Sequence, residues 1–153
     1  MRMDELERIV QGRMFQYSSY KQELASFETA ALNQTVKISE TGVRGSYISD
    51  PTARGGVLLA EPPPKVKEKY EWCAAIDEAH QDCLDEDMGN PFGLAYVMEK
   101  NFAIGGEPHP KAQNETYRKR ICHDCNIAES TFYVWLKRIT GHAIYRAAKR
   151  GLI

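Results

Sequence analysis

Apolar residues recur at every third or fourth position along most of this chain, which is the spacing of helices that bury one face. No segment alternates long enough to indicate a β-sheet. The sequence therefore predicts an all-α fold, with a break near Gly12 in its first helix. The segments predicted to be helical are 3–34, 65–84, 92–102, 118–139 in two pieces, and 142–152.

Glycine and proline divide the chain into parts. The stretch ETGVRGSYISDPTARGG, which begins at Glu40, has four glycines and one proline and shows no helical periodicity, apart from a short helix expected from Pro51. Three consecutive prolines end at Pro64, and a helical pattern resumes at Lys65. The parts predicted in this way are an N-terminal helical region 1–39, a linker 40–63, central helices 64–110 and a C-terminal module 111–153.

The segment RKRICHDCNIAESTFYVWLKRI, residues 118–139, has the pattern of two short helices joined by a tight turn. Ile121, Cys122 and Cys125 form the inner face of the first helix. Asn126 suits the turn, because Asn tolerates a left-handed backbone better than most residues. Ile127 is expected in the core, and a second helix over 128–139 buries Phe132, Leu136 and Ile139 before a break at Gly141. This is typical of a helix-turn-helix DNA-binding domain, whose second helix lies in the major groove.

The outer side of the second helix carries polar and aromatic residues that suit DNA. Such side chains read base edges, while Arg and Lys neutralise phosphates. The alternative is an ordinary helical hairpin with a solvated basic face. The residues predicted to face DNA from this helix are Glu129, Ser130, Tyr133, Val134, Lys137 and Arg138. Further phosphate contacts are predicted from Arg118, Lys119 and Arg146.

Charge is divided unevenly along the chain. Residues 111–153 hold nine Lys or Arg and three acidic residues, whereas the whole chain has 20 basic and 21 acidic residues. The preceding part is therefore acidic, although the net charge of the chain is only −1. A basic module that coincides with a helix-turn-helix pattern favours binding to nucleic acid.

Other chemistry is weakly indicated. Cys122 and Cys125 form a CxxC pair, for which burial as small apolar residues, a zinc site and redox activity are alternatives. The acidic run 82–87 is either a solvated helix end or a divalent metal site. No nucleophile–base pair or cofactor loop is recognisable, so neither an enzyme nor a cofactor is predicted. The start MRMDELERIV lacks a secretory signal and no apolar run approaches a membrane span, which predicts a cytoplasmic protein.

Several sequence segments of the chain resemble those of phage-encoded late transcription regulators of the RinA and ArpU type, from phages and prophages of Gram-positive bacteria. The resemblance covers 110–130 residues loosely. The segments that carry it are YSSYKQELASFE, SYISDPTARGGVLLA, EWCAAIDEA, STFYVWLKRI and AAKRGLI. It implies an activator of late genes with a C-terminal unit similar to the promoter-reading domain of sigma factors. By position it adds Thr131 to the DNA-facing residues. Ala128 stands where a capping Ser is usual.

These patterns predict a sequence-specific transcriptional regulator that binds double-stranded DNA in the bacterial host cytoplasm. RNA polymerase and a second copy of the chain are possible further partners, and no membrane is expected. Two alternatives remain. One is a DNA-packaging protein such as a small terminase subunit, and the other is a protein-interaction module that does not bind DNA.

Overall fold

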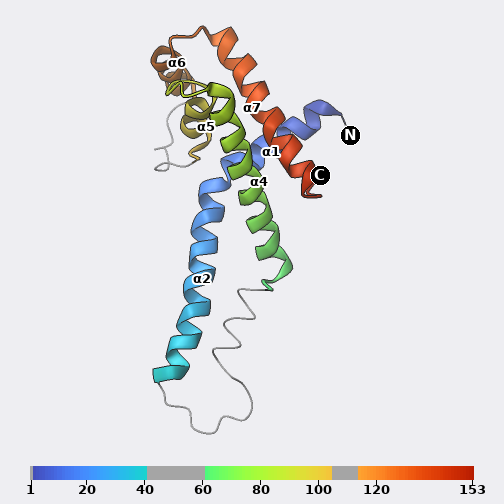
Figure 1. The fold of residues 1–153 in the computed structure, drawn as a ribbon, viewed down its shortest axis with the longest axis vertical. Helices are drawn as coiled ribbons and strands as arrows, with labels where there is room; N and C mark the ends of the chain where they lie inside the picture. The colour runs from blue at the N-terminus through green and yellow to red at the C-terminus, as the bar shows by residue number, and fades with distance from the viewer. Residues whose placement is uncertain (1, 41–60, 105–113) are drawn as a thin grey trace. The chain divides into compact units, whose positions relative to one another are not determined.

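A computed structural model of the chain describes residues 2–40, 61–104 and 114–153, apart from the side chains of 34–40 and 114–116. These residues contain helices and no strand, which confirms the predicted all-α fold for the described part of the chain (Figure 1). The short helix predicted from Pro51 lies outside it. The helices are α1 (Met3–Phe15), α2 (Tyr17–Glu40), α4 (Pro64–Asp87), α5 (Leu94–Phe102), α6 (Asn114–Cys125) and α7 (Glu129–Lys149).

Two predicted helix boundaries at glycines are wrong. The first helix does not break at Gly12 but continues to Phe15, and α2 begins after the single residue Gln16. The second predicted break, at Gly141, is absent because α7 runs without interruption from Glu129 to Lys149. A glycine inside a helix costs only about 1 kcal/mol relative to alanine. Burial of Ile139, Thr140, Ala143 and Ala147 on both sides of Gly141 offsets that cost in α7.

The chain forms two compact units, one of residues 19–70 and a larger one of residues 1–18 with 71–153. In the smaller unit the hydroxyl of Tyr70 donates a hydrogen bond of 2.7 Å to Glu28 Oε1 on α2. Lys69 pairs with Glu23 beside it. Burial, aided by the Glu28 carboxylate, raises the pKa of Tyr70 to about 12. These contacts join the first turns of α4 to α2 within this unit.

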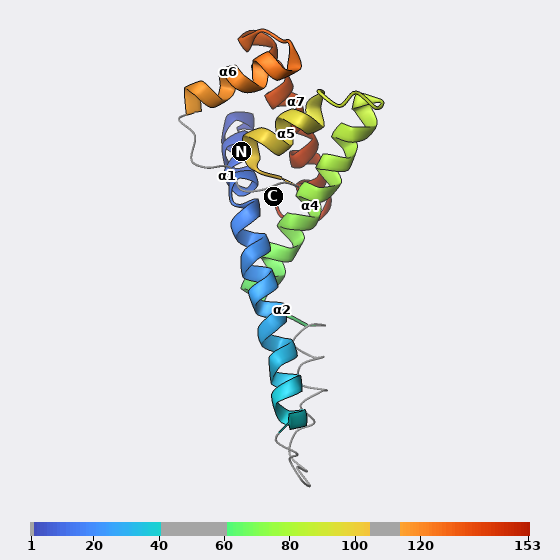
Figure 2. The same cartoon turned by 90° about the vertical axis from the view of Figure 1, so that its left-hand side faces the viewer.

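The core of the larger unit is built around α7. This helix packs against α1, α5 and α6, and α5 also packs against α6, which lies above it in Figure 2. At the crossing of α1 and α7 the Nε2 of Gln11 donates a hydrogen bond of 3.1 Å to Thr140 Oγ1. Thr140 in turn donates to the carbonyl oxygen of Leu136 at 2.7 Å. The largest fully buried side chains of this core include Met14, Ile76, Met98, Phe102, Phe132 and Ile139.

The N-terminus of α5 is capped from a distance by Asp87, the last residue of α4. Its Oδ1 accepts a hydrogen bond of 2.7 Å from the backbone N–H of Leu94, and its Oδ2 accepts one of 2.9 Å from Ala95. Gly93 makes this possible, because a Cβ at that position would overlap the Asp87 carboxylate. Position 93 therefore requires glycine because the Asp87 carboxylate lies too close to the backbone for a side chain. Within the described residues, no helix has both the length and the apolar character needed to cross a membrane.

Candidate nucleic-acid interface

A turn of three residues joins α6 to α7. Asn126 has φ of 55°, the left-handed conformation predicted for it. The backbone N–H of Ile127 donates to the carbonyl oxygen of Cys122 at 3.0 Å, and that of Asn126 donates to His123 at 3.1 Å. Both bonds satisfy carbonyl groups at the end of α6, a common way to end a helix. The turn thereby fixes the direction in which α7 leaves α6.

The inner faces of the two helices follow the predicted spacing. Ile121, Phe132 and Ile139 are buried. Leu136 and Ile127 are half-buried, so Ile127 covers the edge of the core and does not enter it. The N-cap of α7 is Ala128, whose side chain cannot accept a hydrogen bond from the first turn.

The outer face of the first turns of α7 is uncovered by the described residues. Glu129, Ser130 and Lys137 are exposed, and Tyr133 and Val134 retain 49% and 64% of their accessible surface. Thr131, which the resemblance placed on this face, is half-buried. The face therefore combines a hydroxyl, an aromatic ring, a branched apolar side chain and an ammonium group.

Two basic residues of α6 stand beside this face. The Arg118 guanidinium lies 5.1 Å from the centre of the Tyr133 ring, and its Nη1 is 3.8 Å from Glu129 Oε1. A cation over an aromatic ring is attracted by the electrons of that face, so Arg118 restrains Tyr133. Lys119 is exposed and has no carboxylate partner among the described residues.

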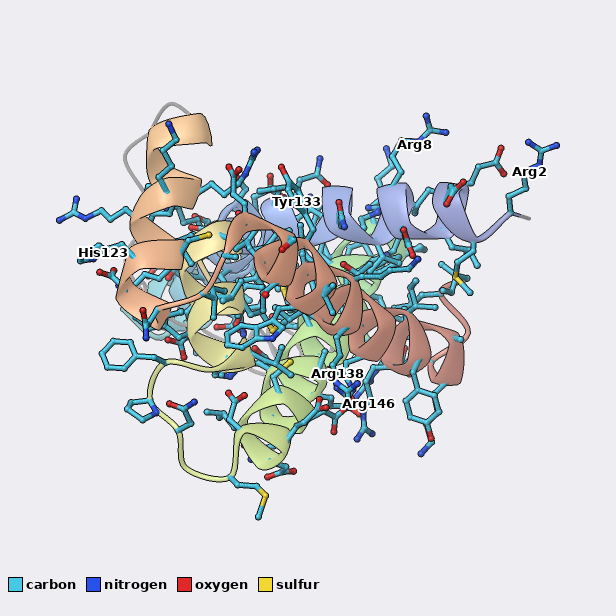
Figure 3. The ribbon with its side chains drawn as sticks, turned by 90° about the horizontal axis from the view of Figure 1, so that it is seen from above. Arg2, Arg8, His123, Tyr133, Arg138 and Arg146 are labelled. Atoms are coloured by element: carbon cyan, nitrogen blue, oxygen red, sulfur yellow. The ribbon has the colours of Figure 1, made fainter. Side chains whose placement is uncertain are left out.

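The opposite side of α7 forms ion pairs with α4. Arg146 makes two bonds to Asp82, of 2.7 and 2.6 Å, and a third of 3.2 Å to Glu78. Figure 3 shows Arg138 and Arg146 on the α4 side of α7, with Tyr133 on the other side. We call this set of contacts the α4–α7 ladder. Its pairs are Arg150 with Glu71 and Glu78, Arg146 with Glu78 and Asp82, and both His142 and Arg138 with Glu86.

The ladder gives Arg138 and Arg146 a role that the sequence did not predict. Both were predicted to contact DNA, and the structure places both guanidinium groups against carboxylates of the same chain. The sequence signal was present, because Glu78, Asp82 and Glu86 are four residues apart and so face one side of α4. The basic residues 138, 142, 146 and 150 repeat the same spacing.

The ladder also sets the acidities of its carboxylates. Hydrogen bonds from Arg146 hold the pKa of Asp82 below its usual range. Hydrogen bonds from Arg138, and then from His142, lower the pKa of Glu86 in the same way. A carboxyl group whose pKa is lower in the folded protein stabilises the fold above its unfolded pKa, and that contribution is lost as the pH falls.

We therefore expect the larger unit to lose stability as the pH falls below about 4, where these carboxyl groups begin to take up protons in the unfolded chain but not yet in the folded one. Arg146→Gln should lower the Tm at pH 7, and the difference from the unchanged protein should shrink towards pH 2. Thermal unfolding measured from pH 7 to pH 2 tests this. Lys137→Gln, which removes a charge outside the ladder, should give a curve parallel to that of the unchanged protein. A parallel curve for Arg146→Gln would contradict the assignment.

The cysteines have buried surroundings. Cys122 is buried in α6, and burial raises the pKa of its thiol. Burial also raises the pKa of the Cys125 thiol to about 11. Both cysteines are free thiols, with Cys122 buried and Cys125 half-buried. Within the part of the chain that the structure describes, no group of three or more His, Cys, Asp or Glu side chains is arranged to hold a metal ion.

The acidic run 82–87 is accounted for by contacts inside the chain. Asp82 and Glu86 belong to the ladder, Asp87 caps α5, and Asp85 Oδ1 accepts a hydrogen bond of 3.1 Å from Gln81.

Comparison of the chain with protein-family models, with curated proteins and with solved structures finds no match.

Proposed function

We propose that this chain is a sequence-specific DNA-binding transcriptional regulator, in which α6 and α7 act as a helix-turn-helix unit. The observation on which the proposal depends is the uncovered face of α7 over residues 129–137, bordered by Arg118 and Lys119. An α-helix with its side chains is about 10–12 Å across and the major groove is about 12 Å wide, so the groove can admit this part of α7.

The residues on this face have two proposed roles, contact with base edges and contact with phosphates. Ser130 and Tyr133 have hydroxyl groups that can bond to base edges, and Val134 offers an apolar contact of the kind that thymine methyl groups accept. Lys119 and Lys137 are exposed cations for phosphates. Arg138 and Arg146 are left out of the proposed surface, because a phosphate would have to displace the carboxylates that already bind them.

The resemblance to phage late-gene regulators suggests which DNA to test. It makes promoters of late genes the proposed targets and activation the proposed effect, with RNA polymerase as a proposed partner. If two copies of the chain associate, the targets should be paired half-sites about one helical turn apart.

A second candidate is a protein-interaction module. It is favoured by the apolar character of Tyr133 and Val134, whose exposed surfaces would suit a protein partner as well as a base. The ladder favours it too, because pairing within the chain reduces the positive charge that the C-terminal module presents.

The test is the binding of the full chain to DNA that flanks its own gene, compared with random duplex, over a range of salt concentrations. We expect retention of particular fragments, with an affinity that falls steeply as salt rises. Tyr133→Ala should weaken specific binding by roughly 5- to 150-fold, since one good base contact is worth about 1–3 kcal/mol. Lys137→Ala should weaken binding to all duplexes about equally and make the salt dependence shallower by about one unit, since Lys137 is assigned to a phosphate. Lys149→Gln is the matched control, because Lys149 lies over Tyr145 at the other end of α7. Equal and weak binding to all duplexes at every salt concentration would overturn the proposal and leave the interaction module.

A further inference from the structure

Two glycines in the larger unit have no structural explanation among the described residues. Gly12 lies inside α1 and Gly141 lies inside α7, and both are exposed. A Cβ at either position would meet no atom of the described structure within 4 Å, and neither residue has a positive φ. Glycine weakens a helix relative to alanine, so each position costs stability without a packing reason. In this they differ from Gly93, where the Asp87 carboxylate leaves no room for a side chain.

Each of these glycines follows an exposed cation by one helical turn. Arg8 precedes Gly12 by four residues, and Lys137 precedes Gly141 by four, so each pair lies on one face of its helix. Neither cation has a carboxylate partner among the described residues. On both α1 and α7, an exposed basic side chain is therefore followed, one turn later on the same face, by a glycine whose backbone no side chain covers.

The two pairs are brought together where α1 crosses α7. The hydrogen bond between Gln11 and Thr140 joins the residues that immediately precede Gly12 and Gly141. Val10 and Met14, which anchor α1 in the core, have no exposed surface. In Figure 3, Arg8 points away from the α4 side of the unit, where Arg138 and Arg146 lie, and Tyr133 is on the α1 side of α7. Tyr133 and the crossing with α1 therefore lie on the same side of α7.

We propose that the sugar-phosphate backbone of one DNA strand passes over this crossing, held by Arg8 and Lys137 and lying close to the helix surface at Gly12 and Gly141. The proposal rests on the proposed function and adds α1 as a second DNA-binding element. A helix in the major groove has a phosphate strand on each side of it. Lys119 on α6 serves one strand, and α1 lies where it can serve the other. The acidic residues Asp4 and Glu5 lie one turn before Arg8 and limit the contact to the later part of α1.

The glycines allow a test in which stability and binding change in opposite directions. Gly12→Ala and Gly141→Ala should each raise the Tm by roughly 4 °C, because alanine favours the helix and meets no neighbour. Each should also weaken DNA binding by about tenfold, because a methyl group separates the phosphate strand from the helix. A higher Tm with unchanged affinity in both variants would overturn the proposal.

The role of Arg8 is tested through the salt dependence of binding. Arg8→Gln should make the slope of log affinity against log salt shallower by about one, the effect of losing one phosphate contact. Lys149→Gln removes the same charge at a distance and should leave the slope unchanged. An unchanged slope for Arg8→Gln, while Tyr133→Ala still weakens specific binding, would overturn this proposal and leave the proposed function standing. Failure of the unchanged protein to bind any DNA specifically would instead overturn the proposed function.

Discussion

Phe132→Ala is expected to destabilise the larger unit by about 3–5 kcal/mol, the usual cost of removing a buried aromatic ring. Phe132 lies in the first turns of α7 and retains only 2% of its accessible surface. A domain of this size is typically stable by only about 5–15 kcal/mol, so the loss is a large fraction of the total. Unfolding by urea, followed by circular dichroism, measures the change.

The adjacent substitution provides the control. Tyr133→Ala removes a side chain that is half exposed and whose ring touches Phe132 only at its edge, with centroids 5.7 Å apart. Its effect on the free energy of unfolding should be within about 0.5–1 kcal/mol, while its effect on DNA binding should be large. A strong loss of stability from Tyr133→Ala, with little from Phe132→Ala, would mean that the inner and outer faces of α7 have been assigned the wrong way round.

Those two faces were predictable from the sequence because they depend on local spacing. Phe132 and Ile139 are seven residues, or about two helical turns, apart and so lie on one side of the helix. Both are buried. Asn126 marked the turn because few residues other than glycine accept a left-handed backbone, and its φ of 55° agrees. Such features need no knowledge of which distant segment packs against the helix.

The α4–α7 ladder could not be predicted in the same way. A row of carboxylates four residues apart is also common on helices that face water, so the spacing alone does not identify a partner. Arg146 and Asp82 are 64 residues apart in the chain, and only the packing of the larger unit brings them together. The uneven charge of the chain is therefore partly neutralised by ion pairs within it. Several basic residues of the C-terminal module pair with carboxylates of α4, in the acidic part of the same chain.

The glycines show a related limit of sequence interpretation. The sequence predicts helix breaks near Gly12 and at Gly141, and both residues lie within helices. Packing on the other side of each helix outweighs the small intrinsic cost of glycine. Packing explains why glycine is tolerated at both positions but not why glycine is present there. The open space around both positions makes contact with an outside molecule our proposed answer.

Gly93 is the glycine for which the largest loss of stability is expected, and it provides a direct test of the cap on α5. Gly93→Ala places a Cβ where the Asp87 carboxylate now lies, so that carboxylate must move. The backbone N–H groups of Leu94 and Ala95 would lose their acceptor, and loss of such a cap costs about 1–2 kcal/mol. We expect a total of about 2 kcal/mol, measured by urea unfolding.

A double-mutant cycle separates the loss of the cap from any other effect of the new side chain. Asp87→Ala should cost about the same as Gly93→Ala, because both remove the same two hydrogen bonds. Once Asp87 is alanine, the space beside position 93 is open, and adding Gly93→Ala should cost little more. Residues that act through one shared contact are not additive in this way. If the two losses simply add, Gly93→Ala does not act through the Asp87 carboxylate, and the close approach of that carboxylate would have to be abandoned as the reason for glycine at position 93.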